Sequence, residues 1–188
     1  MKSIKLNMTG ETISFVKTGK DTNGEYAEII VTIPARKNGP PKHIHPMQDE
    51  YFEPIQGKLE LKAGRKKTTI EPGQTFKVSA NTSHTFANRG NGEVIFTAIY
   101  KPALDIDYFL VQSFNVLNQV SNPKRPGFQI TVDFDYVVKQ IPGQFKIAGF
   151  PGFVLALFAA TGRLFSKPKA QSLEEYSKTL SPNMAFEK

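Results

Sequence analysis

The stretch HIHPMQDEYFEPIQG, residues 43–57, decides how the rest of this chain is interpreted. Residues two apart on a β-strand face the same side, so His43 and His45 project their imidazoles together. A proline then interrupts the strand, and Glu50 returns on the next stretch toward the same interior. A convincing metal shell needs one more imidazole, and the only other histidine of the chain is His84, on another short alternating run. The stretch is therefore a candidate for half of a metal site.

The residues around this stretch have the pattern of an all-β protein. Between Glu11 and Tyr100, short runs rich in Val, Ile, Thr, Phe and Tyr alternate with turn signals such as DTNGE and KNGPP. Many short strands at this spacing are typical of a β-sandwich or β-barrel rather than of a parallel α/β sheet. The basic cluster GRKKT at residues 64–68 lies between two alternating runs, and we interpret it as a solvated hairpin tip.

The pattern changes after Lys101 and Pro102. Apolar residues at helical spacing predict a helix over residues 105–120, with Asp105 as a candidate N-cap. Residues 129–141 fit both an alternating strand and one face of a helix, and their position between two helical segments favours the helix. The last stretch, residues 168–188, is polar and contains Pro168 and Pro182, which predicts a short helix followed by a loose tail.

The segment FPGFVLALFAATGRLF, residues 150–165, is apolar almost all round and predicts a third helix. It is shorter than the ~20 residues that a bilayer span needs, and its glycines and proline shorten the usable helix further. Our first interpretation is a helix packed at a domain or subunit interface. The second is that residues 151–165 contact a membrane surface, because lysine and arginine residues flank them.

Composition limits the partners and the cofactors. A chain of 188 residues is long enough for one good core and an appendage. It has no cysteine, so a metal must be bound by nitrogen and oxygen. The formal net charge of +7 is spread along the chain, and residues 105–120 contain no Lys or Arg, so we expect no nucleic-acid partner. The start MKSIKLNMTGETISF lacks the apolar core of a secretory signal, which predicts a cytoplasmic protein.

The two histidine-containing stretches resemble the two sequence motifs of the cupin superfamily. The first motif is matched throughout residues 43–57, whereas its leading glycine, Gly39, lies closer to the first histidine than is usual. The second motif is matched by GQTFKVSANTSHTFAN, residues 73–88, with Ser79 in place of the usual proline and Asn81 in place of the usual glycine. Asparagine tolerates the left-handed conformation that glycine supplies, so this last departure is mild.

The resemblance implies a mostly β fold: a cupin β-barrel, which is a jelly roll or double-stranded β-helix, followed by C-terminal α-helices. It covers residues 1–102. We expect residues 103–188 to form a helical extension that packs on the barrel or across a homodimer. The resemblance also implies one divalent transition metal (Fe, Mn, Ni, Cu or Zn) inside the barrel. Its expected ligands are His43, His45, Glu50 and His84.

By the same resemblance, the first functional hypothesis is a metal-dependent dioxygenase, similar to quercetin-dioxygenase-like cupins, that acts on a small enolizable or aromatic substrate. Two alternatives stay open: a non-catalytic cupin that binds or senses a small molecule, and a metal-dependent isomerase. Phe52 and Phe86 each follow a ligand by two residues and are candidates to line a substrate pocket, with filling of the barrel core as the alternative. Gln48 and Tyr51 are further polar candidates near the ligand loop, and no catalytic residue is assigned.

Overall fold

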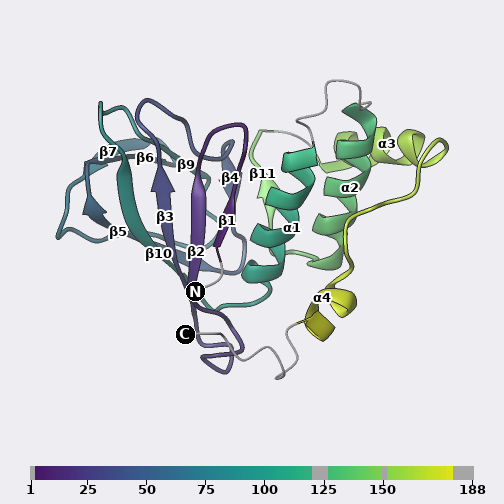
Figure 1. The fold of residues 1–188 in the computed structure, drawn as a ribbon, viewed down its shortest axis with the longest axis horizontal. Helices are drawn as coiled ribbons and strands as arrows, with labels where there is room; N and C mark the ends of the chain where they lie inside the picture. The colour runs from purple at the N-terminus through teal and green to yellow at the C-terminus, as the bar shows by residue number, and fades with distance from the viewer. Residues whose placement is uncertain (1–2, 120–126, 150–151, 180–188) are drawn as a thin grey trace.

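The computed structural model describes residues 3–119, 127–149 and 152–179. Its strands form two antiparallel sheets that make a jelly-roll barrel, and its helices lie beside this barrel (Figure 1). Within the described residues, the six-stranded sheet has the order β1 (Ser3–Lys5), β2 (Thr12–Lys17), β3 (Ala27–Ile33), β10 (Val94–Lys101), β5 (Asp49–Gln56) and β8 (Phe76–Val78). The five-stranded sheet has the order β11 (Lys146–Ile147), β4 (His43–Ile44), β9 (His84–Ala87), β6 (Leu59–Ala63) and β7 (Lys66–Ile70). The mostly β fold is thus confirmed.

Alternation along the strands buries one face of each sheet. In β3, every second residue from Ala27 to Ile33 is 3% exposed or less, while the intervening residues are half-buried. Leu59 and Leu61 of β6 enter the same core from the opposite sheet. Burying each large aliphatic side chain contributes about 1.5–3 kcal/mol, so the barrel core is the main source of stability.

Strand β10 sets the register of the six-stranded sheet. It pairs with β3 from Val94↔Ile33 to Tyr100↔Ala27. On its other side it pairs with β5, which places Tyr100 directly opposite Glu50. A slip of one residue would turn the inward face of β5 outward, so this pairing determines that Glu50 points into the barrel.

Two turns beside the ligand strands, one after β5 and one before β9, need a left-handed backbone. Gly57, which ends the first motif, has a φ of 74°, and a Cβ there would lie 2.8 Å from the carbonyl oxygen of Glu93. Asn81, which replaces the usual glycine of the second motif, has a φ of 63°, as expected. The last residue of that motif, Asn88, is fully buried, and its Nδ2 donates to the carbonyl oxygens of Ile33, Pro34 and Gly92. Asn88 therefore joins the end of β3 to the turn before β10 rather than serving the site.

The helices of the described residues are α1 (Ile106–Asn118), α2 (Gly127–Gln140), α3 (Gly152–Arg163) and α4 (Leu173–Thr179). They confirm the helix predicted over 105–120, the helical alternative for 129–141 and a short helix near the C-terminus; the tail after residue 179 lies outside the described residues. Asp105 stands at the N-cap position of α1 but makes no side-chain capping bond. Its carboxylate instead accepts a hydrogen bond of 2.7 Å from Nε2 of Gln144.

Over residues 157–163, where the structure describes its side chains, helix α3 packs on α2 by one face. A Cβ at Gly162 would lie 2.6 Å from Cγ2 of Val132, so the missing side chain permits the close approach of the two helices. Ala159 on the same face is fully buried, whereas Leu157 and Phe158 are 63% and 61% exposed. The sequence suggests a helix that is buried on all sides, but within the single chain Leu157 and Phe158 stay exposed. In the described part of the chain, no helix is both long enough and apolar enough to cross a membrane.

The extension also adds a strand that sequence reasoning did not predict. β11 extends the five-stranded sheet by pairing with β4, with Ile147 opposite His43. The amide of Ala148 donates to the carbonyl oxygen of Lys42 at 2.9 Å and prolongs this contact. The domain boundary expected at residue 102 stays a prediction, but the segment around β11 shares a sheet with the barrel (Figure 1).

A buried carboxyl group at the start of β2 should make the stability of the fold depend on pH. Glu11 is 5% exposed, and burial raises its pKa from 4.5 to about 7. The folded state therefore favours the neutral acid, and its contribution to stability is present below pH 4.5 and is lost as the pH rises through 7. We expect Glu11→Gln to increase the free energy of unfolding at pH 8 by about 1–3 kcal/mol, and to have little effect at pH 4.

Urea unfolding of both proteins at the two pH values measures this difference. The matched change Glu25→Gln alters an exposed carboxylate and should leave both values unchanged. An equal effect of Glu11→Gln at both pH values would show that the titration of Glu11 does not contribute.

Candidate metal centre

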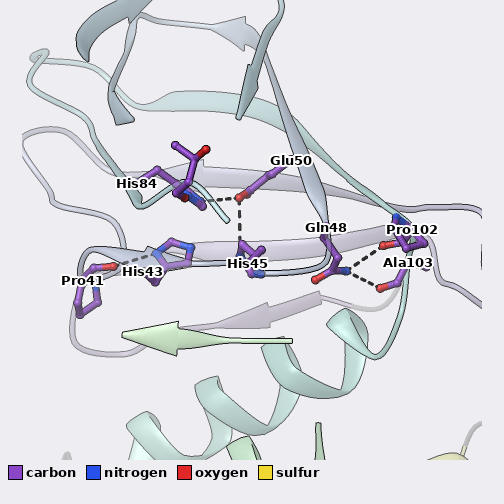
Figure 2. A network of polar contacts seen from close by, with 9 residues as sticks. Pro41, His43, His45, Gln48, Glu50, His84, Pro102 and Ala103 are labelled. Carbon is purple, nitrogen blue, oxygen red and sulfur yellow. Dashed lines mark hydrogen bonds and ion pairs between the residues drawn. The ribbon is translucent and has the colours of Figure 1, made fainter. Parts of the chain in front are cut away.

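Four side chains from three strand segments converge inside the barrel. The candidate ligand atoms of His43, His45, Glu50 and His84 all lie within 4.8 Å of one another. All four residues are buried, with exposures of 6% or less. His43 and His84 are opposite each other in the pairing of β4 with β9, and Glu50 reaches them from β5 in the other sheet (Figure 2). The structure thus brings together every residue that the sequence proposes as a ligand.

Main-chain carbonyl groups orient two of the imidazoles. Nδ1 of His43 donates to the carbonyl oxygen of Pro41 at 2.9 Å, and Nδ1 of His84 donates to that of Thr82 at 3.0 Å. Because a carbonyl oxygen only accepts, Nδ1 carries a proton in both rings, and Nε2 is the ring atom that faces the cluster. Nε2 of His84 lies 2.7 Å from Oε2 of Glu50, and Nε2 of His45 lies 3.7 Å from the same oxygen. These nitrogen and oxygen atoms, which are the candidate ligand atoms for a cation, therefore face a common point.

The third imidazole has a different neighbour. Nδ1 of His45 is buried and has no hydrogen-bond partner among the described residues. Gln48 lies beside it, and Nε2 of Gln48 donates to the carbonyl oxygens of Pro102 and Ala103 at 3.0 and 2.8 Å (Figure 2). These two bonds determine which end of the carboxamide is nitrogen, so its Oε1 is the end free to accept a hydrogen bond from an imidazole N–H.

Of the two polar candidates near the ligand loop, only Gln48 is at the site. It is 2% exposed and joins the ligand loop to the turn that follows β10. Tyr51 lies on the other face of β5, where the ammonium groups of Lys77 and Lys101 lie 5.6 and 5.8 Å from its ring centre. Tyr51 is turned away from the site because successive residues of a strand face opposite sides of the sheet, and its neighbour Glu50 faces the interior.

The protonation states suit metal binding at neutral pH. Burial, with the charges of the neighbouring imidazoles, lowers the pKa of His43 to about 3, and burial also lowers the pKa of His45. For Glu50, burial raises the pKa, but the three imidazoles outweigh it and lower the value to about 2. For His84, burial lowers the pKa, but the Glu50 carboxylate outweighs it and raises the value above 6.5. A cation would therefore displace the proton held between His84 and Glu50.

Tyr100 is a site residue that sequence reasoning missed. It faces Glu50 across the β10–β5 pairing, and its ring lies 5.5 Å from that of His45 in an edge-on contact. Burial and the nearby Glu50 carboxylate raise the pKa of Tyr100 well above 10. The phenol therefore keeps its proton and can act only as a donor toward the carboxylate. Tyr100 ends an ordinary alternating run, so no sequence signal connects it to Glu50.

Phe52 and Phe86 lie on the inner side of the ligands. Their rings are 5.7 Å apart, and both contact Phe96, at 5.9 and 5.3 Å. Phe52 also lies 6.1 Å from the ring of His84. Both are buried in the barrel core, and their assignment to a substrate pocket stays a prediction.

The opposite side of the ligands is closed by the extension. The ring of Phe145 stacks on His43 at 5.6 Å with an interplanar angle of 24°, and lies edge-on to His45 at 5.9 Å. Phe109 of α1 contacts Phe145 at 4.3 Å. We call residues 141–148 the cover. A small hollow beneath it has no room for a water-sized sphere, and it is lined by His45, Gln48, Ile106, Phe109, Ile141, Gln144 and Phe145.

Several bonds hold the cover in place. Gln144 and Asp105 bond reciprocally: Nε2 of Gln144 donates to the carboxylate, and the Asp105 amide donates to Oε1 of Gln144 at 3.1 Å. The pairing of β11 with β4 attaches the other end of the cover beside His43. Phe145 lies about 100 residues after His43, and the strand pairing and helix contacts that bring the two together have no pattern in the local sequence. The sequence alone therefore could not identify Phe145 as a site residue.

The donor set fits a divalent transition metal. Three imidazole nitrogens and one carboxylate oxygen, in ligand form and within reach of one point, are the chemistry that such ions prefer over the oxygen-only sets of calcium and magnesium. Nδ1 of His45 is buried beside the Gln48 carboxamide, and a hydrogen bond between the two would orient the ring of a metal-bound histidine.

Comparisons with known proteins concern the domain and the fold of the barrel. The family model described as a cupin domain matches residues 29–100. Among solved structures, KdgF from Halomonas sp. aligns with a TM-score of 0.50 and 17% identity, covering 57% of this chain and 91% of KdgF. No curated protein gives a significant match.

Two further structures show weaker likeness. A predicted oxalate decarboxylase from Thermotoga maritima has a TM-score of 0.48 and 15% identity, covering 54% of this chain and 90% of its own. A sugar phosphate isomerase of the cupin superfamily from Silicibacter pomeroyi has a TM-score of 0.43 and 20% identity, covering 49% of this chain and 59% of its own. Likeness at such identities concerns the fold alone. The KdgF alignment and the family model together give the barrel the cupin fold, and the region that the cupin-domain model matches, residues 29–100, contains all four candidate ligands.

Proposed function

We propose that this protein is a metal-dependent dioxygenase that acts on a small, largely apolar organic molecule of the enolizable or aromatic class. The observation that carries the proposal is the contact between the buried ligand cluster and an aromatic wall. Phe145 stacks directly on His43, so a substrate that reaches the ligands would meet apolar rings on the same side.

The residues that would hold the metal are His43, His45, Glu50 and His84. A divalent Fe, Mn, Ni, Cu or Zn ion bound by them would supply Lewis acidity and one or two open coordination positions. Tyr100 would keep the Glu50 carboxylate oriented, because its phenol retains a proton at all physiological pH values. Gln48 would hold the ring of His45 in one orientation.

The lining of the hollow favours a neutral or weakly polar substrate. Apart from His45, its side chains are four apolar groups and two carboxamides, without a lysine or arginine. The Gln144 carboxamide is already occupied by Asp105, which leaves Gln48 as the polar neighbour of an incoming molecule. A phosphorylated sugar needs cations that this lining does not offer, and this argues against an isomerase of phosphorylated sugars.

Besides its apolar lining, the cover would also exclude water from the ligands. The hollow is too small for water, so a substrate has to displace the Phe145 side chain or move the whole cover. Closure over a bound substrate would then keep a reactive, electron-rich molecule away from bulk solvent. The same closed state also favours a second candidate function, a non-catalytic cupin that binds or senses a small molecule.

Metal content tests the basis of both functions. Protein purified without an affinity tag should contain about one equivalent of a transition metal per chain by elemental mass spectrometry. Glu50→Gln and His45→Ala should reduce the content below about a tenth of an equivalent, because each removes a buried donor. Glu53→Gln, on the same strand but away from the cluster, should keep it. Full occupancy in the Glu50 and His45 variants would place the metal elsewhere.

Metal affinity should depend on pH through one proton. His84 has a raised pKa and must lose its proton to bind a cation, whereas the pKa values of His43, His45 and Glu50 are lowered, so these three groups are already deprotonated at neutral pH. Below pH 6.5, the affinity for Co²⁺ should therefore fall about tenfold for each pH unit, and it should level off at alkaline pH. Isothermal titration in buffers of different ionisation enthalpy counts the released protons. Release of two protons would contradict this assignment.

Oxygen consumption separates the two candidate functions. Metal-loaded protein given enolizable diketones or electron-rich phenols should take up dioxygen in step with substrate loss, and His84→Ala should not. Phe145→Ala should keep its metal but change KM at least about threefold more than kcat, because it removes wall contact rather than a ligand. Ligand binding by thermal shift without oxygen uptake for any of these substrates would support the binding function instead.

A further inference from the structure

The outer face of α3 carries an unusual concentration of exposed apolar side chains. Leu157, Phe158, Leu164 and Phe165 are 63%, 61%, 80% and 78% exposed, and Phe128 of α2 adds a fifth residue at 37%. The rings of Phe128 and Phe165 lie 6.3 Å apart. We call these five residues the α3 patch. The other exposed large hydrophobic residues of the described chain are scattered singly, as Met8, Val16, Met47 and Ile55.

The helical period explains why the patch is continuous. Positions 157, 158, 164 and 165 fall within one side of the helix, because hydrogen bonds from Leu164 to Thr161 and from Phe165 to Gly162 continue the turn beyond Arg163. Ala159 and Gly162 occupy the opposite side, against α2. The patch therefore faces away from the protein, and α3 lies at the end of the molecule that is distant from the barrel (Figure 1).

The charge around the patch has one sign. From residue 142 to residue 173 the sequence contains no aspartate or glutamate, but it contains Lys146, Arg163, Lys167 and Lys169. Lys167 and Lys169 directly follow the patch and are exposed, and no carboxylate of the described residues forms an ion pair with them. The nearby carboxylates of α2 are buried, and Asp135 is already paired with Arg163 and Lys139.

We infer that the α3 patch docks on the surface of an anionic phospholipid bilayer. Leucine and phenylalanine side chains would enter the boundary between headgroups and acyl chains, and Lys167 and Lys169 would contact the lipid phosphates. α3 has 12 residues, about 18 Å of helix, so it lies on the bilayer rather than across it.

The charges also decide against a second copy of the chain as the occupant. A two-fold dimer places the same patch against itself, which would bring Lys167 and Lys169 close to their own copies. No acidic residue between positions 142 and 173 could compensate these cations. An anionic lipid surface compensates them without such a residue.

Vesicle sedimentation of the full chain tests the inference. Vesicles of phosphatidylcholine with about one third phosphatidylglycerol should bind the protein at least about tenfold better than phosphatidylcholine alone, and added salt should weaken the binding. Leu164→Ser with Phe165→Ser, and separately Lys167→Glu with Lys169→Glu, should each reduce binding at least about tenfold.

Matched controls replace residues of similar exposure elsewhere. Met8→Ser with Ile55→Ser and Lys37→Glu with Lys62→Glu should bind vesicles as the unchanged protein does. Circular dichroism and metal content should be unchanged in all four variants, which separates this test from that of the metal site. The inference would be overturned if the protein did not bind vesicles, or if Lys167→Glu with Lys169→Glu left vesicle binding unchanged. A dimer that dissociates only in the Leu164 and Phe165 variant, without vesicle binding, would also overturn it and assign the patch to a second copy.

Discussion

Glu50 and His84 come from opposite sheets of the barrel, and their side chains meet at 2.7 Å inside its core. Each is 1% exposed, so neither has water as an alternative partner. Removing one member of such a pair leaves the other desolvated, at a cost of about 3–5 kcal/mol. The contact therefore requires the two sheets to keep their spacing and β5 to keep its register against β10. Main-chain carbonyl groups behind His43 and His84 serve the same purpose, because they turn Nε2 of each ring toward the carboxylate.

The barrel by itself would leave this cluster open on one side. The extension closes that side with the ring of Phe145 and with a two-residue strand beside His43. Gln144 and Asp105 then connect the cover to the start of α1, which is why Asp105 does not cap the helix that it precedes. The extension is thus part of the site, and the access of any substrate depends on how easily these few contacts open.

The side of the extension that faces the barrel and the side that faces away from it differ in their chemistry. Toward the barrel it offers aromatic rings and neutral carboxamides, which suit a closed apolar space. Away from the barrel, α3 offers large apolar side chains bordered by uncompensated lysines. A close helix contact through Gly162 separates the two, because it buries Ala159 on one side of α3 and leaves Leu157 and Phe158 exposed on the other. One appendage can therefore serve the metal site and an external surface without conflict.

The sequence by itself determined the parts of this protein that depend on local spacing. Strand alternation predicted the β-barrel, helical periodicity predicted α1 and favoured α2, and the positions of His43, His45, Glu50 and His84 indicated one cluster. Only the tertiary structure placed Tyr100 opposite Glu50, turned Tyr51 outward and laid Phe145 on the ligands. It also showed that α3, apolar on all sides in sequence, buries only one side over residues 157–163, where its side chains are described. These features depend on which distant segments pair and in what register, and residue spacing carries no information about such pairing until the chain has folded.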